Sequence, residues 1–287
     1  MRRRPKQGRP SQRRPNQRRP NYLAGFGSLV WLGVVGLPLY VLLVTTLRSQ
    51  SDYATNGPLS LPRRLTADNY LHAFSGGFGQ DLVNTLLVTV SVVALVLLLV
   101  PPLAYAIVRS RGRSMRMVFR VFLLGLAIPA QAVIVPMFYV ISQAGLYDDL
   151  SGVVLPTAAF CLPICTLVLT GTMRDITPEL YEAMAVDGAS PWRVFWRLVL
   201  PLSRGGLATV VVFAALQAWN GFLFPLVLTQ SDATKVITLG LYNFQTEHGV
   251  DAPGLLAAVV LSMLPVLVVY LFARRALVQG LMGVGGK

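Results

Sequence analysis

Charged side chains are scarce in this sequence, and they are almost absent from its long apolar stretches. Only 13% of the 287 residues are charged and 54% are hydrophobic, whereas soluble domains carry roughly 25% charged residues. A helix needs roughly 20 apolar residues to cross the hydrocarbon core of a bilayer. Six stretches are long enough: 26–47, 82–108, 117–143, 150–171, 206–229 and 254–273. The sequence therefore predicts an all-α, polytopic membrane protein with six transmembrane helices.

The composition of these six predicted spans excludes one way of driving transport. They contain no Asp, Glu, Lys or His, and the single Arg120 lies close to one edge of its span. Proton- and ion-coupled carriers place ionisable groups inside the membrane as relays or coordinating sites. If this chain transports a solute, the energy is expected to come from elsewhere.

Motifs for nucleotides, metals and catalysis are also missing. The only Gly-Lys pair is Gly286-Lys287, so no phosphate-binding G-x-x-x-x-G-K-[ST] motif occurs. Cys161 and Cys165 lie one helical turn apart, a spacing that seldom allows a disulfide, and we interpret them as small packing residues. With no clustered acid, base, nucleophile or metal set, the chain is expected not to be an enzyme, to bind no metal and to hold no cofactor of its own.

Positive charge alternates between the two sides of the predicted spans. The segments on the side of both termini hold 21 of the 25 Lys and Arg residues, and the other three loops hold only four. Eight of the twelve acidic residues fall in those three loops. Because cytoplasmic loops retain Lys and Arg, both termini and the segment 172–205 are predicted to be cytoplasmic.

The first 25 residues are predicted to be a disordered, basic cytoplasmic tail. Residues 1–21 hold nine Lys or Arg and no acid, and such a segment cannot bury apolar surface. An arm that binds nucleic acid or anionic lipid is one interpretation. A solvated tail that fixes the topology is the favoured one, so no nucleic acid is expected as a partner. The apolar run that follows is too long for a signal peptide, and we expect a retained helix.

A polar segment between residues 172 and 205 interrupts the apolar spans. Thr177-Pro178-Glu179 is typical of a helix start, with Thr177 as N-cap and proline at the first helical position. Gly188 can adopt the backbone conformation that ends a helix, and Ser190-Pro191 begins a second helix that ends at Pro201. These two short helices, joined by a sharp turn, either enter a groove of another protein or lie at the membrane surface without a partner.

Proline and a few polar residues mark the spans themselves. Every predicted span contains proline, and the resulting bends suit a transport path, although proline is common in membrane helices. Gln217, Trp219 and Asn220 form the other polar group inside a span. They either face the path or form hydrogen bonds between helices.

The polar segment resembles the signature loop of bacterial ABC-importer permeases. That pattern is E-A-A, three residues, G, nine residues, I, one residue and L-P, and every spacing is kept here. The matching residues are Glu182, Ala183, Met184 in place of the second alanine, Gly188, Leu198 in place of isoleucine, and Leu200-Pro201. Further segments are similar to the second six-span permease of the maltose-type sugar family. They are Asn84-Thr85-Leu86, Leu103-Ala104-Tyr105-Ala106, Gly145-Leu146-Tyr147-Asp148, residues 218–222 and residues 277–287.

The resemblance implies the permease subunit of an ATP-driven sugar importer in the bacterial cytoplasmic membrane. In that family two different permeases pair as a heterodimer, two ATP-binding subunits hold ATP-Mg, and an extracytoplasmic solute-binding protein delivers the solute. The segment 172–205 would be the coupling-helix loop within the membrane domain 26–273, and the tail 274–287 would be a second, weaker contact. The implied ATPase-coupling residues are Glu182, Ala183, Met184, Asp187, Gly188 and Pro201.

Two alternatives to a sugar permease stay open. One is an ABC permease for a different polar solute, since the partner permease can carry most of the substrate contacts. The other is a non-transporting membrane scaffold whose basic tail recruits nucleic acid or lipid.

Overall fold

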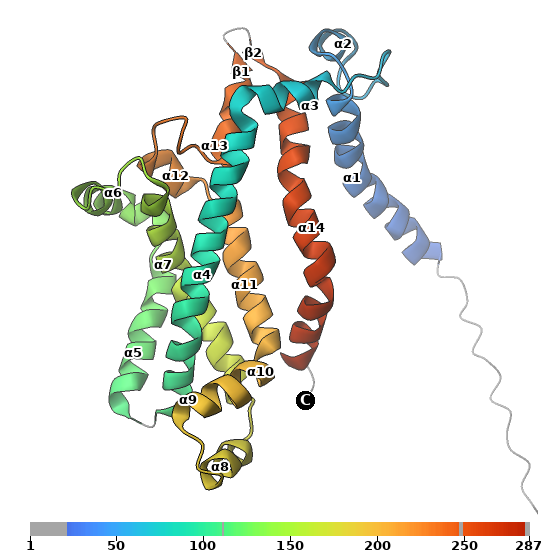
Figure 1. Ribbon diagram of the computed structural model, residues 1–287. Coiled ribbons are helices and arrows are strands. Elements are labelled where there is room, and N and C mark those ends of the chain that lie inside the picture. Colours follow the sequence, from blue (N-terminus) through green and yellow to red (C-terminus); the bar gives the residue numbers. More distant parts are fainter. Residues whose placement is uncertain (1–21, 111, 247–248, 285–287) are drawn as a thin grey trace, which may run out of the picture. The chain divides into compact units, whose positions relative to one another are not determined.

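The computed structural model describes residues 22–110, 112–246 and 249–284, which are almost entirely helical (Figure 1). The predicted basic tail, except for its last residues, and the end of the predicted C-terminal tail lie outside this range. Residues up to Leu42 form one unit and residues from Leu43 form a second, larger one. The all-α fold class predicted from the sequence is confirmed.

Fourteen α-helices, five shorter π- or 3₁₀-helices and two very short strands make up the described residues. The first half contains α1 (Tyr22–Thr46), α2 (Gln50–Asn56), α3 (Asp68–Ala73), η1 (Phe74–Phe78), α4 (Gly79–Arg109), α5 (Arg113–Leu124), η2 (Gly125–Ala127), η3 (Ala130–Val133) and α6 (Ile134–Gln143). The second half contains α7 (Leu150–Arg174), α8 (Pro178–Val186), α9 (Pro191–Val194), η4 (Phe195–Val199), α10 (Leu200–Leu202), α11 (Arg204–Trp219), α12 (Leu223–Leu228), α13 (Ile237–Gly240), η5 (Leu241–Phe244), β1 (Gln245–Thr246), β2 (Gly249–Val250) and α14 (Ala252–Val284).

Four helical stretches among the described residues are long and apolar enough to cross a membrane, or up to six if two sharply bent pairs each count as one span. The four are Gly25–Thr46, Asp68–Arg109, Leu150–Arg174 and Ala252–Leu271. They coincide with four of the predicted spans. Helix α14 continues to Val284, so the predicted tail from residue 274 is helical for most of its length.

The predicted span at 117–143 is a bent pair of helices, because the chain turns by 95° between Arg113–Ala127 and Ala130–Gln143. The break falls at Ile128-Pro129. Proline cannot donate a backbone hydrogen bond and disfavours a helical conformation in the residue before it. Ile128 is accordingly extended, with φ −89° and ψ 112°.

The predicted span at 206–229 is also interrupted. Helix α11 ends at Trp219, and the short helix α12 begins only at Leu223. A helix continued through this point would bring the ring of Pro225 against the carbonyl of Gly221. Ser203 marks a further bend, of 76°, between Pro191–Leu202 and α11.

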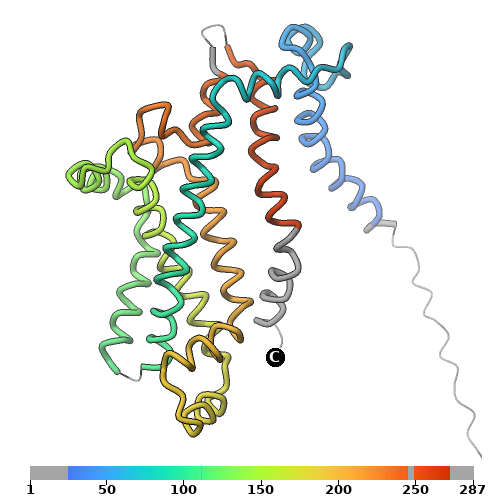
Figure 2. The backbone as a smooth tube through the Cα atoms, in the orientation of Figure 1, coloured from blue at the N-terminus to red at the C-terminus, as the bar shows by residue number. Residues whose placement is uncertain are grey.

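Helices α4, α7 and α11 pack against one another and form the main core. On α4 a stripe at every fourth position is buried, namely Val88, Val92, Val96, Val100 and Ala104. On α7 the corresponding stripe is Cys161, Cys165, Leu169 and Met173. The two cysteines are therefore packing residues, as predicted. Figure 2 shows that α4 runs from the end of the core near α8–α10 to the end near α3 and α13.

Candidate functional site: the 172–205 hairpin

The polar segment folds as the predicted pair of short helices at one end of the core (Figure 1). Helix α8 starts at Pro178 after the extended residue Thr177, although the Thr177 side chain forms no capping hydrogen bond. Ser190 caps α9, and its side chain accepts a hydrogen bond from the Arg193 amide. We call residues 177–202 the hairpin.

The turn between the two helices depends on Gly188. Its φ is +70°, a left-handed conformation that costs glycine little because glycine has no Cβ. The Gly188 amide donates to the Ala185 carbonyl at 3.0 Å, and the Ala189 amide donates to the Met184 carbonyl at 2.9 Å. These two bonds form a Schellman motif, which satisfies carbonyls that the end of a helix leaves free. The predicted role of Gly188 in the turn is confirmed.

One face of α8 is free of contacts with the core. Glu182 and Ala183 are exposed, Val186 is 88% exposed, and Asp187 and Gly188 are exposed at the turn. The structure thus brings together, on one accessible surface, most of the residues that the sequence assigned to coupling.

Met184 and Pro201 do not belong to this exposed face of α8. Met184 is half-buried and packs against the core of this chain, so the larger side chain in place of the second alanine fills space on the inner side. Pro201 is exposed within α10, and the second part of the hairpin stays helical through Leu202. The predicted helix end at Pro201 is therefore one residue short.

Helix α8 is attached to the last turn of α4 through an aromatic ring. Tyr181 is buried, and the guanidinium carbon of Arg109 lies 4.7 Å from the centre of its ring. A cation at that distance is attracted by the ring face. Burial raises the pKa of the Tyr181 phenol, while the charge of Arg109 opposes the shift, so the side chain is neutral at physiological pH.

The second half of the hairpin is attached to the neighbouring turn of α4. The Tyr105 hydroxyl donates to the Pro191 carbonyl at 3.3 Å, and its ring lies 5.4 Å from the ring of Phe195. Trp192 and Trp196 stack on each other beside Phe195 and are largely exposed. Tyr105 and Arg109 are four residues apart and therefore share one face of α4.

The three residues predicted to face a transport path have different environments. Trp219 is buried, and its indole nitrogen donates to the Ser262 carbonyl of α14 at 3.2 Å. Of the two predicted roles, Trp219 therefore has the hydrogen bond between helices. Asn220 is exposed and bonds the Leu216 carbonyl of its own helix at 2.9 Å. Gln217 is exposed. The structure leaves Gln217 and Asn220 available to a path and commits Trp219 to helix packing.

Asp148, at the other end of the core, binds a distant loop. Its carboxylate accepts hydrogen bonds from the amides of Gln230 and Ser231 and from the Thr234 hydroxyl, at 2.8, 2.9 and 2.6 Å. These bonds hold the pKa of Asp148 well below its usual range. The sequence singled out Asp148 only through the resemblance, and its partners about 80 residues away were not predictable.

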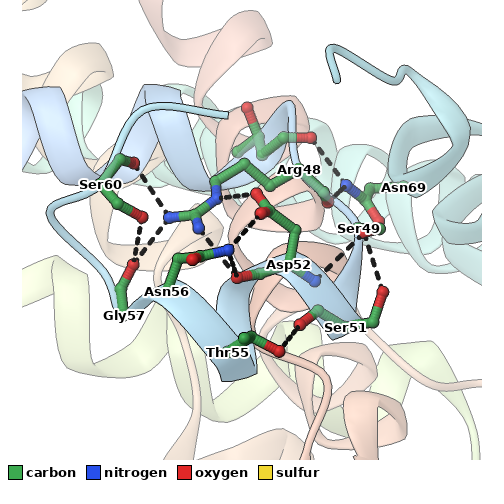
Figure 3. A network of polar contacts seen from close by, with 10 residues as sticks. Arg48, Ser49, Ser51, Asp52, Thr55, Asn56, Gly57, Ser60 and Asn69 are labelled. Carbon is green, nitrogen blue, oxygen red and sulfur yellow. Dashed lines mark hydrogen bonds and ion pairs between the residues drawn. The ribbon is translucent and has the colours of Figure 1, made fainter. Parts of the chain in front are cut away.

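A second polar network surrounds the buried Arg48 (Figure 3). Its guanidinium donates to the Asp52 carboxylate at 2.8 Å and to the backbone carbonyls of Gly57, Ser60 and Asp52. Asn69 donates to the Arg48 carbonyl, and the hydrogen bond from Arg48 lowers the pKa of Asp52. Sequence reasoning counted Arg48 only as a loop charge. An arginine directly after an apolar span and four residues before an acid was the available signal.

The fold defines a multi-pass membrane protein with an accessible hairpin at one end. Residues 101–283 match the family described as "Binding-protein-dependent transport system inner membrane component". The chain belongs to this family of membrane permeases.

Relatives that are named as permease proteins of uptake or transport systems match most of the chain. It is 34% identical to the "Diacetylchitobiose uptake system permease protein NgcG" of Streptomyces coelicolor, over 86% of this chain and 83% of the relative. It is 29% identical to the "Trehalose transport system permease protein SugB" of Mycobacterium tuberculosis, over 91% of this chain and 95% of the relative. The fold is similar to a chain in the crystal structure of a bacterial ABC transporter involved in the import of the polysaccharide alginate, with a TM-score of 0.78 at 22% identity, over 91% of this chain and 99% of that one.

Proposed function

We propose that this chain is one of two permeases of an ATP-driven importer for sugars or oligosaccharides. The cargo class rests on the relatives named for diacetylchitobiose and trehalose uptake. The partners are a second permease in a heterodimer, two ATP-binding subunits that carry ATP-Mg, and an extracytoplasmic solute-binding protein. The observation that carries the proposal is the exposed face of α8, which presents the signature residues away from the core.

In this proposal the hairpin is the coupling site. Glu182 supplies a polar contact to the ATP-binding subunit, Ala183 permits close approach, and Asp187 and Gly188 form the exposed turn. Pro201 fixes the direction in which the chain leaves the hairpin, and Met184 holds α8 on the core. ATP binding would then shift the permease pair between two states through rigid-body movement.

The orientation follows from the proposed docking. The ATP-binding subunits are cytoplasmic, so the hairpin, both termini and the loop near Arg109 face the cytoplasm. The Asp148 and Arg48 networks then face the exterior, where the solute-binding protein delivers its cargo. Gln217 and Asn220 are candidates for the path between the two sides.

The test uses two variants of the hairpin and a control with the same backbone change. Gly188→Val places a β-branched residue at φ +70°, which strains the turn, and Glu182→Lys reverses the charge on the free face. We expect both variants to insert into the membrane and to lose co-purification of the ATP-binding subunit. The control is Gly145→Val, because Gly145 has φ +71° and equal space around it at the opposite end of the core.

The control is expected to keep the ATP-binding subunit bound. Normal co-purification and ATP-driven sugar uptake with both Gly188→Val and Glu182→Lys would contradict the coupling assignment. Uptake of a different polar solute by the intact importer would contradict the cargo class and leave the coupling assignment in place.

A further inference from the structure

Helix α4 is continuous from the hairpin to the opposite end of the core. It comprises 31 residues, Gly79–Arg109, and at 1.5 Å per residue it is about 46 Å long. It passes Pro101 and Pro102 without a break and packs on both α7 and α11. Figure 2 shows this helix running between the two ends, alongside α7 and α11.

The hairpin end of α4 contacts both short helices of the hairpin. Arg109 covers the ring of Tyr181 in α8, and Tyr105 contacts Pro191 and Phe195 in the second half. Tyr181 and Met184 are the side chains by which α8 rests on the core. A displacement of α8 therefore acts on the last turn of α4.

The opposite end of α4 holds residues 230–240, which we call the far loop. Asn84 is buried, and its side-chain amide donates to the carbonyls of Ala233 and Lys235, both at 2.8 Å. The Thr85 hydroxyl accepts from the Ile237 amide at 2.8 Å. These three hydrogen bonds join segments that are about 150 residues apart in the sequence.

Packing adds to these hydrogen bonds. A side chain at Gly240 would overlap the carboxylate of Asp81 in the first turn of α4, so the far-loop backbone lies directly on the helix. Buried, directional hydrogen bonds and close packing allow little relative movement between two segments. A displacement of α4 is therefore expected to move the far loop with it. The far loop is bound on its other side by Asp148.

We propose that α4 moves as one rigid helix and transmits movement of the hairpin to the far loop. Arg109 and Asn84 are the positioning residues at its two ends. The inference rests on the proposed function, because the movement originates in the ATP-binding subunits. It adds a route from the coupling site to the exterior loop that neighbours the Asp148 network.

The experiment places a reporter on the far loop of the complete importer in liposomes. Ala233 is exposed, and Ala233→Cys leaves its backbone carbonyl free to bind Asn84. Cys161 and Cys165 are buried in the core and serve as a low background. The rate of maleimide labelling is measured without nucleotide and with ATP plus vanadate, which traps the ATP-binding subunits with ADP and vanadate in a state that resembles the transition state of hydrolysis.

In the otherwise unchanged importer, the labelling rate is expected to differ between the two conditions. Arg109→Gln and Tyr181→Leu are each expected to remove most of that difference and to lower import per ATP hydrolysed by about fivefold, the lower end of typical coupling effects. Tyr181→Phe keeps the ring under Arg109 and is expected to restore both. Asn84→Ala is expected to remove the difference in labelling from the opposite end.

The outcomes separate this inference from the proposed function. Loss of ATP-binding subunits or of ATP-driven import in the unchanged protein would contradict the proposed function. ATP-driven import with a labelling rate that never changes would contradict the role of α4 alone. So would a change in Arg109→Gln and Tyr181→Leu as large as the change in the unchanged importer. Arg109 is exposed, so its variant tests the inference even if Asn84→Ala fails to fold.

Discussion

The two ends of α4 are attached to their neighbours by different kinds of contact. At the hairpin, a cation over a ring, one tilted aromatic pair and a longer hydrogen bond of 3.3 Å from the Tyr105 hydroxyl hold α8, α9 and η4. At the far loop, a buried amide and a hydroxyl form short, directional hydrogen bonds. Aromatic and cation–π contacts tolerate small changes of angle, whereas buried hydrogen bonds do not. The hairpin end is therefore suited to receive a movement and the far end to follow it.

The largest effect is expected at the far end. Asn84 is buried, and Asn84→Ala takes the donor away from the carbonyls of Ala233 and Lys235. We expect a loss of about 1–3 kcal/mol in the free energy of unfolding, measured by denaturation in detergent. Asn220→Ala is the matched control, since Asn220 is exposed and bonds only its own helix. An equal loss of unfolding free energy in Asn84→Ala and Asn220→Ala would contradict the stabilising role of the bonds between Asn84 and the far loop.

An intermediate effect is expected at the hairpin. Met184→Ala removes part of the packing of α8 on the core and should lower the stability of the hairpin by about 1 kcal/mol, less than a fully buried methionine would. Val186→Ala, on the exposed side, should leave that stability unchanged. Protease sensitivity of the hairpin in the isolated permease measures both. Greater sensitivity of Val186→Ala than of Met184→Ala would reverse the assignment of the two faces.

The smallest effect at neutral pH is expected for Asp148→Asn, since the amide oxygen can still accept hydrogen bonds from the far loop. The folded state lowers the pKa of Asp148 below its ordinary value of 3.8. The carboxylate therefore adds stability that is complete above that value and is lost as the pH falls further. The difference in thermal stability between wild type and variant should be constant near neutrality and shrink below pH 3.8. A difference that grows on acidification would contradict this account.

Local features of the hairpin were predictable because they depend on neighbouring residues. Thr177-Pro178, Gly188 and Ser190-Pro191 carry their conformations in the sequence, and each is found at its predicted place. The exception is the inward position of Met184, which depends on how α8 rests on the core. A match to the family pattern alone does not reveal which residues of the pattern face the partner.

Features that depend on distant segments were not predictable. The partners of Asn84 and Asp148 lie about 150 and 80 residues away, and hydropathy contains no information on such pairings. Bends at the prolines were expected, but how sharply the chain breaks at Pro129 and near Pro225 was not predictable for a different reason. Proline can bend a membrane helix or be passed without a break, as in α4, and the choice depends on the surrounding helices.

The most direct test of the account asks whether the free face of α8 touches the ATP-binding subunit. Val186 is the most exposed large apolar residue of the hairpin, and Val186→Cys can be cross-linked in the assembled importer with a short bifunctional reagent. The account predicts a cross-link to the ATP-binding subunit from Val186→Cys and none from Met184→Cys on the inner side. A cross-link from Met184→Cys alone, or no cross-link from either in an importer that hydrolyses ATP, would contradict it.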